Sequence, residues 1–144
     1  MSGEIIETNG ASDSIKDMLS NAGYSDKAIQ YYIEKPYMGS LPDADQVSEM
    51  TGTCGDTMAV YLKAAHGKIV DVRYQVMGCA GAVSAAMAAV DLVKGKKLED
   101  ARKLEDGDIF RVLQDIPAKK HHCIQLAVKA LHKVIDAYHQ DHPI

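Results

Sequence analysis

Residues 57–93 read TMAVYLKAAHGKIVDVRYQVMGCAGAVSAAMAAVDLV, and this stretch decides the fold. In its first half, apolar side chains alternate with other side chains on both sides of a His66-Gly67-Lys68 turn. Alternation with a period of two on both sides of a turn predicts an antiparallel hairpin with one buried face. The residues predicted to face the core are Met58, Val60, Leu62 and Ala64 from the first strand and Val70, Val72, Tyr74 and Val76 from the second.

The second half of this stretch predicts a buried helix. Residues 80–93 are rich in alanine and almost entirely apolar, and Gly95 suits the helix end. A final helix follows from apolar side chains at helical spacing between Ile124 and Tyr138, opposite a polar face. Shorter helices are predicted within residues 12–21, 25–35, 98–104 and 106–116, and an edge strand at residues 46–51.

Together these elements predict an α+β domain in which a small antiparallel sheet of about three strands carries helices on one face. Residues 1–11 are mostly polar or small and predict a disordered N-terminal tail. Residues 12–144 are enough for a single domain with its own core.

Charge, apolar content and cysteine content argue against several classes of protein. A net charge of −4 without a long lysine stripe argues against nucleic-acid binding. No apolar run reaches the roughly 18–20 residues that span a bilayer, and the N-terminus lacks the pattern of a signal peptide. We therefore expect a cytoplasmic protein without membrane contact, whose three cysteines remain thiols. Since their number is odd and no CxxC occurs, a local zinc finger or thioredoxin-type pair is not predicted.

Each cysteine lies at the tip of a predicted element. Cys54 lies in the turn TGTCGDT, Cys79 in MGCAGA before the buried helix, and Cys123 at the start of the last helix. Helix N-termini favour the thiolate form of a cysteine. For any one motif, a glycine that only makes a turn is an equally good interpretation, but the shared placement of all three cysteines favours a common site. The flanking glycines, which allow positive φ or close approach, are Gly52, Gly55, Gly78 and Gly81.

Two other candidate ligands accompany the cysteines. Asp56 follows Cys54 by two residues, and His122 directly precedes Cys123. A lone aspartate before a strand or a histidine at a helix start is more often structural. Together with thiolates, however, imidazole and carboxylate suit zinc or iron, and several thiolates favour iron–sulfur chemistry.

The motifs GTCGDTM, GCAGAVSAAM and IPAKKHHCIQLA, in this order and with a strand–turn–strand between the first two, resemble the IscU/NifU-type iron–sulfur cluster assembly scaffold (the NifU N-terminal-like domain). The resemblance extends from about residue 24 to 138. It implies a small α+β fold that carries a labile [2Fe–2S] cluster, or zinc or iron in its place, at one solvent-accessible end.

The resemblance also implies site residues and partners. By motif match, Cys54, Cys79 and Cys123 are thiolate ligands, His122 is the imidazole ligand, and Asp56 is the carboxylate that keeps the site labile. The implied partners are a cysteine desulfurase as sulfur donor and apo iron–sulfur proteins as acceptors. Residues 116–120 keep only part of the family's proline-rich chaperone motif, so a dedicated chaperone is not expected. Supporting positions are Lys120, Gly55 and Gly78.

Three functions fit these residues. The first is a scaffold without turnover of its own, and the second is a zinc-bound sulfur relay that accepts persulfide from a cysteine desulfurase. The third, a thiol hydrolase using Cys123 and His122, is disfavoured because adjacent helical residues point about 100° apart. Since Lys119, Lys120 and His122 surround Cys123 in sequence, we expect it to be the most nucleophilic thiol and the persulfide acceptor.

Overall fold

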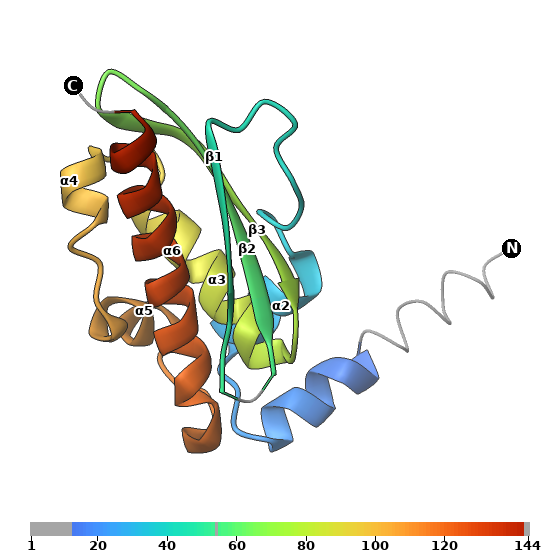
Figure 1. Ribbon diagram of the computed structural model, residues 1–144. Coiled ribbons are helices and arrows are strands. Elements are labelled where there is room, and N and C mark those ends of the chain that lie inside the picture. The colour runs from blue at the N-terminus through green and yellow to red at the C-terminus, as the bar shows by residue number, and fades with distance from the viewer. Residues whose placement is uncertain (1–12, 54, 143–144) are drawn as a thin grey trace, which may run out of the picture.

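The computed structural model describes residues 13–53 and 55–142. The predicted tail at residues 1–11 and Cys54 therefore lie outside the described residues. Three strands, β1 (Gln46–Thr51), β2 (Thr57–Ala65) and β3 (Lys68–Met77), form an antiparallel sheet in the order β1-β2-β3. Helices lie against one face of this sheet (Figure 1). The α+β prediction is confirmed.

A tight turn joins β2 to β3. Both of its residues have left-handed backbone conformations, with φ of 55° at His66 and 76° at Gly67. Two successive residues with positive φ match the type I′ turn, whose twist suits an antiparallel hairpin. Across the core-facing side, Val60 pairs with Tyr74, and both are fully buried.

The start of β3 departs from the prediction. The pairing shifts after Lys63, which lies opposite Asp71, while Ala64 lies opposite Ile69. Val70 is the extra residue of this β-bulge, and it is 56% exposed, whereas Ile69 is buried. The prediction that Val70 faces the core was wrong, because one inserted residue exchanges the two faces of a strand.

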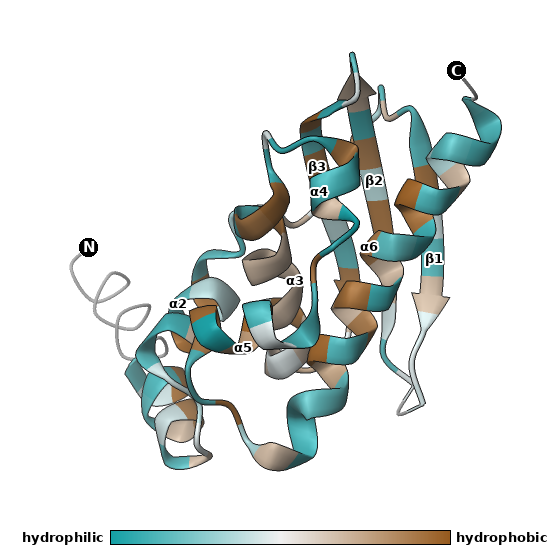
Figure 2. Ribbon diagram, turned by 90° about the vertical axis from the view of Figure 1, so that its left-hand side faces the viewer, coloured by the Kyte–Doolittle hydropathy of each residue, from teal (hydrophilic) through white to brown (hydrophobic). Residues whose placement is uncertain are grey.

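Two long helices cover the core face of the sheet. α6 (His121–Asp141) lies over β1 and β2, and α3 (Ala80–Val93) lies beside it over β3. Apolar segments of the helices and strands face one another in this layer (Figure 2). α3 is buried along most of its length, as its composition predicts, and its buried Ser84 donates its hydroxyl to the Ala28 carbonyl at 2.7 Å. From the core face of β3, the Tyr74 hydroxyl donates to the Ala127 carbonyl of α6 at 2.9 Å.

The remaining helices pack around α3 and α6. α2 (Asp26–Glu34) and α5 (Asp106–Leu113) contact α3, and α4 (Leu98–Ala101) follows the turn at the end of α3. Ser25 caps α2 by accepting a hydrogen bond from the Ala28 N–H at 3.1 Å. A helix over residues 13–21 precedes α2. Among the described residues, no helix is long and apolar enough to cross a membrane.

Candidate metal centre

The site candidates among the described residues lie at one end of the sheet, where the start of β2 meets the starts of α3 and α6 (Figure 1). Asp56 directly precedes β2, and Cys79 is the N-cap of α3. His122 and Cys123 lie in the first turn of α6, after a short 3-10 helix, η1 (Ala118–Lys120). The fold thus brings together side chains from three separate parts of the sequence. Cys54, the third predicted thiolate, lies outside the described residues.

The donor atoms are close to one another. The Cys79 and Cys123 sulfurs are 3.6 Å apart, and Asp56 Oδ2 lies 3.5 Å from the Cys79 sulfur and 3.9 Å from the Cys123 sulfur. One possible ligand atom each from Asp56, His122 and Cys123 lies within 4.8 Å of the others. Tetrahedral ligation with metal–sulfur bonds of about 2.3 Å separates neighbouring sulfurs by about 3.8 Å. The described donors are therefore spaced as ligands of a shared metal or cluster are.

Glycines make this crowding possible in two ways. Gly55 has a φ of 92°, and its N–H donates to the Gly52 carbonyl at 3.0 Å, which closes the turn before β2. Gly78 acts through its missing side chain: a Cβ there would lie 2.7 Å from the Asp56 carboxyl carbon. Such contacts are not tolerated, so the carboxylate reaches the thiols because position 78 is glycine.

The two adjacent histidines have different surroundings. The His121 ring packs edge-on against Phe110, with ring centroids 5.2 Å apart. The Nε2 atom of His122 is buried and has no hydrogen-bond partner among the described residues. Buried polar atoms are normally paired, and an imidazole nitrogen left unpaired beside a thiol and a carboxylate suits metal ligation.

The pKa of the Cys79 thiol is lowered by its neighbours in the centre. A hydrogen bond from Cys123 lowers the pKa of the Cys79 thiol to about 6, helped by the Ala82 N–H and the Lys120 ammonium, while burial and the Asp56 charge oppose the shift. The Cys79 charge in turn raises the pKa of Lys120. The cation that sequence proximity assigned to Cys123 therefore also acts on Cys79. Cys123 itself is fully buried, and its role as persulfide acceptor stays a prediction.

The sequence did not single out Tyr24. Its side chain is largely buried, and its hydroxyl lies near Gly81, beside the Cys123 sulfur. A tyrosine before a helix cap carries no sequence signal of site chemistry, because buried tyrosines are common in cores.

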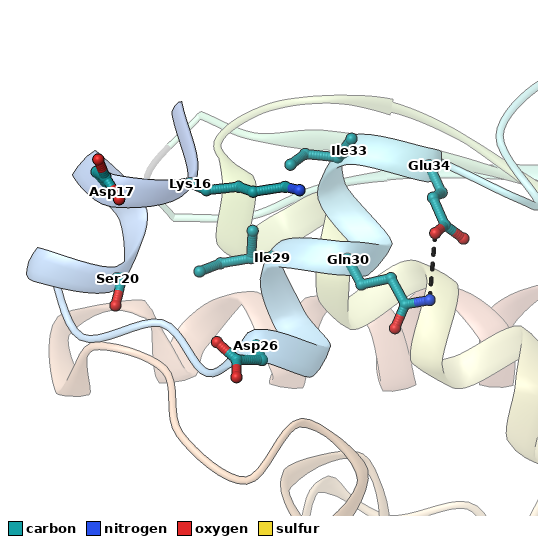
Figure 3. A pocket seen from close by; sticks show the side chains of 8 residues that line it. All are labelled: Lys16, Asp17, Ser20, Asp26, Ile29, Gln30, Ile33 and Glu34. Carbon is teal, nitrogen blue, oxygen red and sulfur yellow. Dashed lines mark hydrogen bonds between the residues drawn. The ribbon is translucent and has the colours of Figure 1, made fainter. Parts of the chain in front are cut away.

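A hollow of about 500 Å³ lies elsewhere, between the helix at residues 13–21 and α2 (Figure 3). Ile29 and Ile33 line it together with charged side chains such as Lys16 and Glu34, and it holds neither thiol nor imidazole. A smaller hollow of about 210 Å³ lies between the end of β1 and α6, and His122 lines it. The smaller hollow thus adjoins the candidate metal centre through His122.

Comparisons with known proteins point to one family. Residues 23–143 match the family described as "NifU-like N terminal domain". An archaeal relative from Archaeoglobus fulgidus, named iron-sulfur cluster assembly scaffold protein IscU 1, is 34% identical over 80% of this chain and 76% of its own. A Drosophila melanogaster relative named iron-sulfur cluster assembly enzyme IscU is also 34% identical, over 80% of this chain and 77% of its own.

Solved structures share the fold. A putative iron-sulfur cluster assembly scaffold protein for the SUF system, from Fervidobacterium islandicum AW-1, superposes with a TM-score of 0.66 at 21% identity, covering 78% of this chain and 96% of the other. The N-terminal part of a nitrogen-fixing NifU-like protein from Brucella abortus gives a TM-score of 0.65 at 20% identity, covering 81% and 94%.

Proposed function

Because the chain belongs to the family of the NifU-like N terminal domain, we propose that it is a scaffold on which iron and sulfide assemble into a labile [2Fe–2S] cluster that passes to apo-acceptor proteins. The observation that carries this proposal is the convergence of two thiols, a carboxylate and an imidazole at one end of the sheet. The cluster is cargo, so the protein binds and releases it without turnover of its own.

The proposed ligands divide into strong and weak donors. Cys54, Cys79 and Cys123 supply thiolates, and His122 supplies an imidazole. Asp56 is a harder donor, which binds iron in a cluster less tightly than a thiolate does. A ligand set with one weak member favours release, whereas four buried thiolates would favour retention. Lys120 supports the site by stabilising the Cys79 thiolate.

Sulfur delivery follows from the thiolate chemistry. We propose that a scaffold thiolate attacks the outer sulfur of a persulfide on a cysteine desulfurase. A new sulfur–sulfur bond forms on the scaffold, and the donor cysteine leaves as a thiolate, so the exchange needs no external oxidant. Cys123 is the acceptor that the sequence predicts, and Cys79 is the thiol whose lowered pKa favours attack.

The cytoplasmic address and the single domain over residues 12–144 stay predictions.

A zinc-bound sulfur relay is the second candidate. The spacing of the described donors also fits a single tetrahedral zinc ion, since zinc accepts sulfur, nitrogen and oxygen ligands together. In that case the metal would stay bound while a cysteine carried persulfide. The two candidates differ in whether the protein accepts iron and sulfide.

Anaerobic reconstitution with ferrous iron and sulfide tests the scaffold proposal. We expect visible absorption typical of a [2Fe–2S] cluster, with about two irons and two sulfides per cluster. His122→Ala should reduce loading, whereas the matched variant His121→Ala should not, because His121 packs against Phe110. Protein that binds zinc but takes up neither iron nor sulfide would instead support the relay.

A further inference from the structure

Tyr24 is held in place by the segment that leads into the metal centre. Its N–H donates to the Leu19 carbonyl at 3.1 Å, and the N–H of the next residue, Ser25, donates to the Asp115 carbonyl at 2.8 Å. On its other side, Gly23 packs against Pro117, which begins the approach to η1. The tyrosine is 8% exposed, so its ring is fixed inside the protein.

The Tyr24 hydroxyl lies at the metal centre. An ideal Cβ built on Gly81, in the first turn of α3, would lie 3.4 Å from the Tyr24 hydroxyl oxygen, 3.5 Å from the Cys123 sulfur and 3.2 Å from Lys120 Cβ. The phenol, the thiol and the lysine stem therefore surround the same methyl-sized space.

This arrangement makes the phenol a donor. A tyrosine hydroxyl has one proton to donate. The nearest sulfur that shares its position next to Gly81 is that of Cys123. Hydrogen bonds from a neutral donor to a charged acceptor are stronger than bonds between neutral groups.

We propose that Tyr24 is a positioning residue of the metal centre, whose phenolic O–H donates a hydrogen bond to the sulfur held at Cys79 and Cys123. This inference rests on the proposed function and adds a residue to it. The hydrogen bond disperses negative charge on thiolate, persulfide or cluster sulfur. Hydrogen bonds to the sulfurs are among the factors that set the reduction potential of an iron–sulfur cluster. Tyr24 thus stabilises the cargo without binding iron.

A pair of tyrosine variants tests this role. Tyr24→Phe and Tyr74→Phe each remove one phenolic hydroxyl from a buried ring, but the Tyr74 hydroxyl donates to the Ala127 carbonyl of α6. After anaerobic reconstitution, Tyr24→Phe should shift the cluster's reduction potential to more negative values and shorten the cluster's lifetime about three- to tenfold, with little change in melting temperature. Tyr74→Phe should lower the melting temperature and leave the potential unchanged.

The outcomes separate this inference from the proposed function. Wild-type protein that takes up no cluster contradicts the function itself. A wild-type cluster that keeps its potential and lifetime in Tyr24→Phe overturns the inference and leaves the function standing. Should Tyr24→Phe fold poorly, fluorotyrosine at position 24 keeps the ring and hydroxyl and makes the phenol a stronger donor. Its cluster should shift to a more positive potential, and an unchanged potential would refute the proposal.

Discussion

The two ends of the sheet differ in the interactions that hold them together. At one end the β2–β3 hairpin closes through His66 and Gly67, and backbone bonds tie it to the chain after α3: the Ile69 N–H donates to the Lys96 carbonyl, and the Leu98 N–H donates to the Gly67 carbonyl, each at 2.8 Å. At the other end, the start of β2 and the end of β3 lie beside a carboxylate and two thiols. Backbone hydrogen bonds hold the first end together, whereas contacts between side chains shape the second.

Glycine shows the difference most clearly. Gly67 has a φ of 76°, and a Cβ there would meet nothing within 4 Å, so glycine serves the backbone conformation. Gly78 has no such positive φ, and a Cβ there would lie 2.7 Å from the Asp56 carboxyl carbon. Glycine at position 78 therefore serves the approach of a side chain. The same residue type is required for conformation at one end and for space at the other.

Gly78→Ala should have the largest effect on the metal centre. The added methyl group would lie 2.7 Å from the Asp56 carboxyl carbon, so the backbone that carries Cys79 must move away from Asp56, and this displaces a thiolate ligand. We expect cluster loading to fall at least tenfold, a loss of about 1.4 kcal/mol or more in binding free energy, while the melting temperature changes little. Absorption and iron content after anaerobic reconstitution measure the loading.

Gly67→Ala is the matched control at the other end. An alanine with positive φ costs about 1–2 kcal/mol, so this variant should unfold at lower urea concentration and still load normally. The comparison between the two ends fails if both variants lose stability and keep their clusters, because Gly78 would then also serve the backbone.

The reactivity of the two described thiols is the next test. In metal-free protein at pH 7, we expect iodoacetamide to modify Cys79 about ten times faster than Cys123. The Cys79 thiol has a pKa of about 6 and is partly exposed, whereas Cys123 is fully buried. Since the thiolate is the nucleophile, the Cys79 rate should rise as the pH passes upward through about 6 and level off above it. Peptide mass spectrometry reports each site separately.

Unfolding in urea provides the control for this prediction. Both thiols should then react at similar rates, with the pH dependence of an ordinary cysteine near 8.5. If Cys123 reacts first in the folded protein, the charge argument from its neighbours in sequence is correct and the hydrogen bond between the thiols does not control reactivity.

Much of the fold could be predicted from the sequence, for reasons that the hairpin illustrates. Met58, Val60 and Leu62 alternate with less buried residues, and they are buried as expected. The bulge could not be predicted, because Ile69 and Val70 are both apolar and either could face the core. Only the pairing with β2 decides between them.

The candidate site also has some features that the sequence predicts and others that only the folded structure reveals. The placement of Cys79 and Cys123 at the starts of predicted helices predicted that these residues lie near one another, because helix starts are visible in a sequence. The effect of Lys120 on Cys79 depends on a contact between segments about forty residues apart in the chain, which local charge counting misses. Tyr24 was missed for the same reason, since its hydroxyl reaches the centre through the packing of Gly23 against Pro117.

Asp56→Ala tests whether the carboxylate controls release rather than folding. Removing the weaker ligand should slow cluster transfer to an apo-ferredoxin several-fold, with the melting temperature nearly unchanged, because a harder ligand binds iron in a cluster less tightly than a thiolate does. Asp43→Ala is the control, since Asp43 pairs with Lys63 at 3.1 Å on the exposed surface and should affect neither property. Faster transfer from Asp56→Ala would show that the carboxylate retains the cluster.

Lys120→Gln should have the smallest effect, and its size indicates how the charge of the centre is stabilised. The Cys123 hydrogen bond is the strongest cause of the lowered Cys79 pKa, and the Lys120 ammonium is a weaker one. Loss of the ammonium should therefore raise the pKa of Cys79 by less than about one unit, seen as a shift of the alkylation profile to higher pH. Lys119→Gln should leave the profile in place. A shift of two units or more would mean that charge outweighs the contact between the thiols. The metal-centre end of the sheet would then depend on the Lys120 ammonium more than on the contacts among its ligand side chains.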